Sequence, residues 1–198
     1  IQCVGSREPQ MPHCSNLCCS FALRSALDLK EQNPDLNIYI LFREMRAFGE
    51  RENLYRAARE KGIIFIRYDL NSKPAVHSAG RDEIITVTVQ EPILGRPVTI
   101  EADFISLQSA IAPTGCRETA KVFNVELDPD GFLAEAPEKL RPLDTTMKGL
   151  FMAGLAVYPK DITESIAQAR GAAARAAEIL AQDEVQIGGL VAEVNSAR

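Results

Sequence analysis

Strand and helix signals alternate over residues 1–68, and this alternation constrains the fold more than any other feature of the sequence. Apolar and β-branched runs predict strands, and amphipathic segments between them predict helices. The predicted strands are residues 1–4, 37–42 and 63–68, and the predicted helices are residues 15–32 and 50–61, the second ending at Gly62. This β-α-β-α-β order is typical of an α/β protein whose parallel strands are joined by right-handed crossovers.

The remaining chain changes character twice. Residues 74–107 combine β-branched alternation with a turn signal at Gly95-Arg96-Pro97, which predicts antiparallel strands that lead back into the sheet through the apolar run 104–107. We place a domain boundary near Gly115, dividing the chain into residues 1–114 and 115–198. Beyond it we expect a helix at 117–123, a turn at 128–131, a strand at 149–154, an Ala-rich helix at 163–181 and a last strand at 185–194.

Composition excludes several classes of protein. The 198 residues are 46% hydrophobic and 25% charged, enough for a real core, and no stretch approaches the roughly 20 apolar residues of a membrane-spanning helix. We therefore expect no membrane insertion. With 22 Lys and Arg against 27 Asp and Glu, the net charge of -5 would repel a phosphate backbone, so nucleic acid is not an expected partner. The chain opens without an initiator Met or a leader pattern, and we interpret it as a fragment of a longer protein.

Four of the five cysteines fall within the first 19 residues, in the spacing C-x10-C-x3-C-C. They are Cys3, Cys14, Cys18 and Cys19. An odd and clustered cysteine count indicates metal or redox chemistry in a reducing, cytoplasmic compartment rather than a disulfide scaffold. We expect Cys3 near the carboxyl end of the first strand, Cys14 at the opening of the next helix with Ser15 as its N-cap, and Cys18 one turn later.

That geometry would bring all four thiols to the mouth of one strand-loop-helix unit. A helix N-terminus stabilises thiolates, which an iron-sulfur cluster needs as ligands. A structural zinc site and buried free thiols are the alternatives, because the spacing matches neither metal's usual template. We expect the neighbouring His13 to be an exposed loop residue and Cys116 to be a buried or surface thiol rather than a ligand.

The same loop is where a dinucleotide-binding unit would carry its glycine-rich phosphate loop. Here it has one glycine and two prolines, and no G-x-G-x-x-G occurs in the chain. A nicotinamide-dependent reductase is therefore disfavoured. Near the carboxyl end, GLFMAG followed by a long helix predicts a helix start whose free amides can contact a pyrophosphate or a flavin carbonyl, although an ordinary packing unit gives the same pattern.

Several longer motifs resemble the flavoprotein A subunit family of heterodisulfide reductase, in the family's order and across essentially the whole chain. They are CVGSRE, CSNLCC, FREMRAFGERENLY, ELDPDGF and GLFMAGLAVYPKDITESIAQARGAAA. The resemblance implies a Rossmann-like parallel sheet with antiparallel strands, forming part of a thioredoxin-reductase-like, two-lobe flavoprotein core. It also implies FAD and a 4Fe-4S cluster as cofactors.

The resemblance assigns roles to particular residues. Cys3, Cys14, Cys18 and Cys19 would be the cluster ligands, and Gly154, Asp161, Ile162 and Thr163 would contact FAD, as half of its site only. Two positions depart from the pattern. Arg24 stands where the family commonly has a Lys near the flavin, and Leu155 stands where many flavoproteins have an Asp for the ribityl chain.

The resulting hypothesis is an oxidoreductase subunit that passes electrons between FAD and a 4Fe-4S cluster in anaerobic thiol-disulfide or sulfur metabolism. Its expected partners are the other subunits of a heterodisulfide-reductase-like complex, with a homodimer as a further possibility. The alternatives are a flavoprotein subunit of a related quinone-interacting membrane-bound complex and a non-catalytic, zinc-binding interaction lobe.

Overall fold

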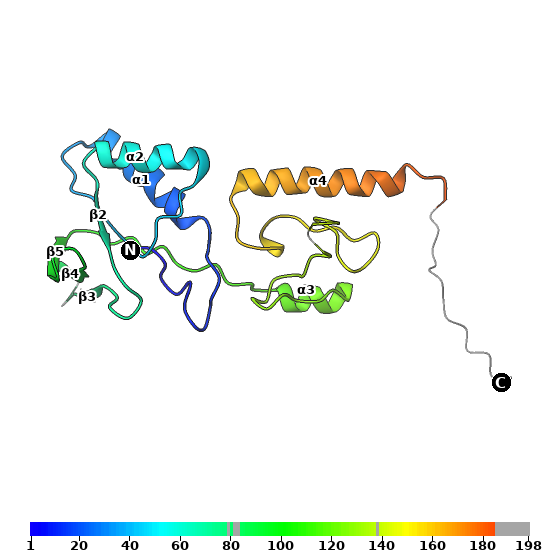
Figure 1. Ribbon diagram of the computed structural model, residues 1–198, viewed down its shortest axis with the longest axis horizontal. Helices are drawn as coiled ribbons and strands as arrows, with labels where there is room; N and C mark the ends of the chain where they lie inside the picture. The colour runs from blue at the N-terminus through cyan, green and yellow to red at the C-terminus, as the bar shows by residue number, and fades with distance from the viewer. Residues whose placement is uncertain (79, 81–83, 138, 185–198) are drawn as a thin grey trace.

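The computed structural model describes residues 1–78, 80, 84–137 and 139–184, and its N-terminal part is built in layers (Figure 1). Strands β1 (Tyr39–Phe42) and β2 (Ile64–Arg67) pair in parallel, with Tyr39 opposite Ile64. Helices α1 (Cys18–Gln32) and α2 (Glu52–Glu60) cover one face of this pair, and a short 3-10 helix, η1 (Gly49–Arg51), precedes α2. The predicted parallel unit and its two crossover helices are confirmed.

An antiparallel sheet covers the other face of the parallel pair. It consists of β3 (Ala75–His77), β4 (Ile85–Glu91) and β5 (Arg96–Ala102) in that order. Adjacent residues of β1 point to opposite layers: Ile40 packs with the helices and Leu41 with Val87 and Val89 of β4. Arg96 and Pro97 lie in β5, so the predicted turn ends two residues earlier, at Gly95 (φ +64°).

Residues 1–4, which were predicted to form a strand, make only an isolated β-bridge and no regular strand. Val4 makes an isolated parallel bridge with Ser109, and the amide of Gln2 donates to the Leu41 carbonyl (2.9 Å). The segment therefore lies between β1 and residues 108–110. This arrangement agrees with the expectation that the chain returns to the sheet after the antiparallel strands.

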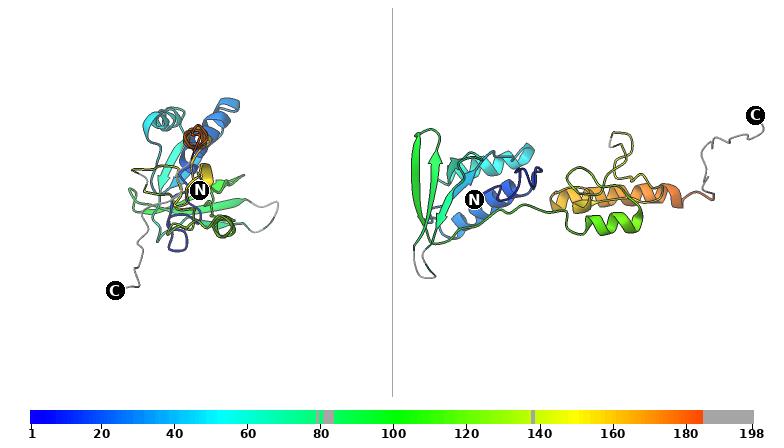
Figure 2. Two further views of the ribbon diagram at one scale, coloured as in Figure 1. Left: turned by 90° about the vertical axis from the view of Figure 1, so that its right-hand side faces the viewer. Right: turned by 90° about the horizontal axis from the view of Figure 1, so that it is seen from below.

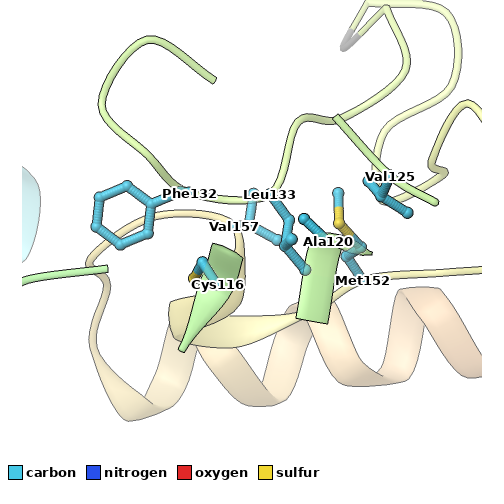
Figure 3. Packing of buried hydrophobic residues seen from close by; sticks show 7 residues of the cluster. All are labelled: Cys116, Ala120, Val125, Phe132, Leu133, Met152 and Val157. Atoms are coloured by element: carbon cyan, nitrogen blue, oxygen red, sulfur yellow. The ribbon is translucent and has the colours of Figure 1, made fainter. Parts of the chain in front are cut away.

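The C-terminal part has a separate, smaller core. Helix α3 (Cys116–Phe123) packs under loops that lead through η2 (Gly154–Ala156) to α4 (Ile162–Leu180). Figure 3 shows the seven buried residues of this core: Cys116, Ala120, Val125, Phe132, Leu133, Met152 and Val157. The predicted strand at 149–154 is wrong, because Phe151 makes only an isolated bridge to Asp144 and Gly154 already begins η2.

Helix α4 differs from expectation in its packing. None of its residues is buried, and Ile162 is 77% exposed. In the described residues α4 lies beside η2 and the loops around it rather than on a sheet, as Figure 1 and the right-hand view of Figure 2 show. The predicted strand at 185–194 lies outside the described residues, and the division at Gly115 stays a prediction.

Among the helices that the structure describes, none is both long and apolar enough to cross a membrane.

Candidate functional site

The four clustered cysteines lie around the start of α1. Cys3, Cys18 and Cys19 are buried and Cys14 is half-buried, and all are free thiols. Burial, followed by the charges of Cys3 and Cys14, raises the pKa of the Cys18 thiol. Burial also raises the pKa of Cys19 to about 11, with smaller contributions from the other three cysteines. The structure therefore brings the four sulfurs into one another's electrostatic range.

The start of α1 differs from the predicted cap. The helix begins at Cys18 and its N-cap is Leu17, which makes no side-chain cap hydrogen bond. Ser15 accepts a hydrogen bond from the Ile111 amide instead (3.2 Å), and Asn16 has a left-handed φ of +57°, so Cys14 lies in the loop and does not open the helix. The first turn of α1 is therefore without a side-chain cap, and Cys18 and Cys19 lie at the positive end of the helix.

Backbone amides donate hydrogen bonds to two of the sulfurs. Asn16 N donates to Cys14 Sγ (3.3 Å) and Arg46 N donates to Cys19 Sγ (3.4 Å). Hydrogen bonds to sulfur stabilise the thiolate form that metal binding requires. The described residues contain no group of three or more His, Cys, Asp or Glu side chains placed to hold a single metal ion.

His13 and Cys116 are both buried. For His13 the prediction of an exposed residue is wrong: its Nε2 donates to the Ile111 carbonyl (2.8 Å), and its ring stacks edge-on against Phe132 at 5.1 Å. His13 thereby ties residues 1–17, which carry Cys3 and Cys14 and are called the cysteine loop below, to the C-terminal part. Cys116 belongs to the C-terminal core.

Residues 43–46 form a wall of the site that sequence reasoning missed. Arg43 is 8% exposed and its guanidinium donates to the carbonyls of Ser6 and Arg7, in the loop between Cys3 and Cys14. The Glu44 carboxylate pairs with Arg7 (2.9 Å) and Arg46 (3.1 Å). The available signal was the position of FREMR directly after a buried strand, since functional residues of α/β folds gather at that edge.

An open pocket of about 360 Å³ adjoins the cysteines. It is lined by Ser15, Leu17, Cys18, Ser20, Phe21, Arg24, Gln108, Ser109 and Ile111. The pocket walls are mostly apolar, yet Ser20 Oγ is buried there without a hydrogen-bond partner. Arg24, at the position that the resemblance places near the flavin, thus shares a cavity with Cys18, one of the candidate ligands.

The second predicted site is the start of α4. Asp161 is its N-cap and accepts from the Glu164 amide (2.7 Å), while Glu164 accepts from the Asp161 amide, which closes a capping box. Asp161 also pairs with Arg51. The amide of Gly154, at a φ of +72°, donates to Gln168 Oε1 (2.9 Å), and Ile162 and Thr163 are exposed. The helix start is therefore partly closed by the chain's own side chains.

A further pocket of about 370 Å³ lies beside this helix start, between Asn16 and Gln168. Lys160 is buried in its wall and donates to Gln168 Oε1 (2.8 Å). Burial lowers the pKa of Lys160.

Comparison with known proteins identifies a set of relatives along nearly the full chain. The A subunit of H(2):CoB-CoM heterodisulfide,ferredoxin reductase from Methanothermobacter thermautotrophicus is 38% identical over 201 residues, which cover 99% of this chain and 30% of that protein. The second iron-sulfur A subunit of CoB-CoM heterodisulfide reductase from Methanopyrus kandleri is 39% identical, covering 98% of this chain and 30% of that protein. Nearly the whole chain is homologous to one segment of the heterodisulfide reductase A subunit. The resemblance found in the motifs is confirmed.

The homologous segment is a minor part of these A subunits, because the chain spans about 30% of their length. No family model matches the chain. Among solved structures, thioredoxin reductase of T. acidophilum has a TM-score of 0.55 at 18% identity, covering 85% of this chain and 55% of that one. This likeness confirms the predicted thioredoxin-reductase-like α/β fold.

Proposed function

We propose that the chain is the cluster-binding part of an oxidoreductase subunit, in which Cys3, Cys14, Cys18 and Cys19 hold a 4Fe-4S cluster that exchanges electrons with FAD. One observation carries the proposal: four free thiols converge on an uncapped helix start that adjoins an open pocket. Such a cluster accepts and releases one electron at a time. The protein's task is to supply thiolates, positive charge and exclusion of water.

The thiol arrangement favours a polynuclear centre over zinc. Zinc-sulfur bonds of about 2.3 Å require tetrahedral sulfurs about 3.8 Å apart, and the described residues provide no group placed around a single ion. Each ligand of a 4Fe-4S cluster binds a different iron, so its four sulfurs lie farther apart. The charges of Cys3 and Cys14 contribute to the raised pKa of Cys18 and Cys19, so these sulfurs lie within electrostatic range of one another, which suits that larger centre.

The pocket beside Cys18 supports the place of the flavin. Ser20 Oγ is buried without a partner at its wall, and Arg24 brings a permanent positive charge to the same cavity. Gly154, Asp161, Ile162 and Thr163 would supply a second, partial contact surface at the start of α4. We propose that these residues form half of an FAD site.

We infer the physiological role, as part of the same proposal, from the names of the relatives. Their names point to heterodisulfide and ferredoxin as redox partners, which favours anaerobic thiol-disulfide metabolism over the quinone-linked alternative. Other subunits of such a complex are the proposed partners. A homodimer and a cytoplasmic location stay predictions.

The decisive experiment measures iron, sulfide and zinc after reconstitution without oxygen. We expect about four irons and four sulfides per chain, with visible absorption that a reductant bleaches. Cys18→Ser should lose most of the iron, whereas Cys116→Ser, which removes an equally buried thiol from the other core, should keep it. Equal iron in the two variants, or zinc alone in the parent protein, would contradict the ligand assignment.

A flavin titration tests the half-site separately. We expect the purified chain to bind FAD weakly, because the glycine-rich phosphate loop is absent from its sequence. Stoichiometric flavin that survives purification would show that the cofactor lies elsewhere on the chain.

A further inference from the structure

Residues 43–46 contact both the cysteine loop and the first turn of α1. The backbone of this segment holds Cys19 from two sides: the Arg46 amide donates to Cys19 Sγ (3.4 Å), and Cys19 Sγ lies 3.8 Å from the Glu44 carbonyl that accepts from it. The Arg43 guanidinium holds the backbone of Ser6 and Arg7, between Cys3 and Cys14. One short segment after β1 therefore fixes the surroundings of three ligands.

The segment also surrounds the site with positive charge that carboxylates do not fully balance. Arg43 is buried and forms no ion pair among the described residues, and its Nε has no hydrogen-bond partner there. A buried charge without a counter-charge is costly, so an anion nearby would stabilise the folded state. Within the described part of the chain, five of the six buried polar side-chain atoms without partners belong to Arg43 and to Gln2, Ser6, Arg7 and His13 of the cysteine loop.

Arg46 interacts with two of the cysteines, through its amide, which donates to Cys19 Sγ (3.4 Å), and through its charge, which Cys14 influences. Its guanidinium is 43% exposed, is held by Glu44 Oε2 at 3.1 and 3.3 Å, and lies beside Cys14. Against the opposing effect of burial, the Glu44 hydrogen bond and the charge of Cys14 raise the pKa of Arg46. Because Glu44 is shared with Arg7, two arginines divide one carboxylate, which leaves net positive charge at the edge of the site.

We propose that Arg46 is the residue that sets the reduction potential of the cysteine-bound centre, by placing its guanidinium at Cys14 and its amide on Cys19. The inference rests on the proposed cluster. Reduction adds one electron to the centre and no bond forms or breaks; the electron comes from a chemical reductant in the test below. A fixed positive charge stabilises the added negative charge, so Arg46 raises the potential, and as an arginine it does so without exchanging a proton.

The test is a redox titration of the reconstituted chain and of three variants. Arg46→Gln removes the charge but keeps the backbone amide, Arg46→Lys keeps the charge, and Arg56→Gln removes an exposed charge on α2 whose side chain donates to Asn53 Oδ1. Iron and sulfide are counted first. We expect Arg46→Gln to hold iron as the parent does and to favour the reduced state about tenfold less, a shift of about 59 mV to lower potential for a one-electron couple.

The controls separate the possible failures. Arg46→Lys should recover most of the shift, and Arg56→Gln should show none. If Arg46→Gln holds iron at the potential of Arg56→Gln, the role of Arg46 is refuted while the proposed cluster stands. If Arg46→Gln loses its iron, Arg46→Lys decides: iron at the parent potential supports the inference, and loss of iron there too overturns it. A parent protein without iron refutes the proposed function itself, and the inference with it.

Discussion

The starts of α1 and α4 are the same structural element built in opposite ways. Leu17 leads into α1 with helical backbone angles, no side-chain cap and no acidic residue in the first turn, so sulfurs occupy the positive end of the helix. Asp161 leads into α4 with extended angles, closes a capping box with Glu164 and pairs with Arg51. The protein leaves one helix start open to anions and neutralises the other with its own carboxylates.

The difference bears on which part of a flavin each start can accept. Two carboxylates at the start of α4 would repel a pyrophosphate, whereas the amides of Ile162 and Thr163, in exposed residues, remain suited to a neutral carbonyl oxygen. A bound flavin would therefore meet α4 through its ring rather than through its phosphates. At α1 the charge balance is reversed, because Arg7 and Arg46 share the single carboxylate of Glu44 and the buried Arg43 has no ion-pair partner among the described residues.

Phe132 joins these two regions, and its removal should have the largest effect. The side chain is 1% exposed, and its ring contacts His13 at 5.1 Å on one side and Tyr158 at 5.5 Å on another. Phe132→Ala should lower the free energy of unfolding by about 3–5 kcal/mol, because it leaves a cavity in the C-terminal core. Denaturant titration measures this loss.

The exposed Val122 of α3 provides the control for Phe132. Val122 is 78% exposed, so Val122→Ala should change stability by less than about 0.5 kcal/mol. Phe132→Ala should also weaken iron retention, since His13 loses its ring contact and belongs to the cysteine loop. Unchanged stability and unchanged iron in Phe132→Ala would show that the two regions are independent.

Asp161 tests the closed helix start. Asp161→Ala should cost about 1 kcal/mol of stability, because it removes the side-chain acceptor of the capping box, and it also frees Arg51. Asp161→Asn keeps an acceptor without the charge and should retain most of the cap. Thr163→Ala, an exposed neighbour, serves as the control. Thermal unfolding followed by circular dichroism ranks the stability of the three variants. An Asp161→Ala variant as stable as Thr163→Ala would contradict a stabilising role of the Asp161 cap.

The elements that were predictable from sequence are those whose signals are local. The helix preceding Gly62 ends at Glu60, one residue before its predicted end, because Gly62 adopts a φ of +76° and its amide donates to the Arg59 carbonyl. The strands around Ile40 and Ile66 are continuous apolar runs, and both of these residues are buried between the layers, although each strand begins with an exposed residue. The four cysteines were likewise recognisable as a cluster from their spacing alone.

The failures arose where a distant segment decides the local structure. Ser15 has the residue type of an N-cap, but the Ile111 amide, 96 residues away, uses its hydroxyl. His13 was judged by its polar loop, yet Phe132 and Ile111 bury it. Arg46 resembles any surface arginine until Cys14 and Cys19 are brought against it. Long-range contacts of this kind leave no periodic pattern in the sequence.

Arg175 and Asp144 hold the middle of α4 to the preceding loop, and we expect their effect to be the smallest. Two hydrogen bonds from Arg175 (2.9 and 3.0 Å) lower the pKa of Asp144 below its ordinary value of 3.8. Because the Asp144 pKa is lowered in the folded protein, the unfolded chain binds this proton more readily than the folded chain does. The ion pair therefore stabilises the fold at pH values above the ordinary pKa, and this stabilisation is lost as the pH falls through the lowered pKa of the folded protein.

Urea titrations between pH 3 and 7 should show that Arg175→Gln has a slightly smaller free energy of unfolding than the parent at neutral pH and that this difference disappears in acid. Because Glu178 also contacts Arg175, Glu178→Gln is the matched control and should keep the acid dependence. A gap between the parent and Arg175→Gln that persists at pH 3 would mean that the stabilisation comes from packing of the arginine stem on the loop rather than from the ion pair.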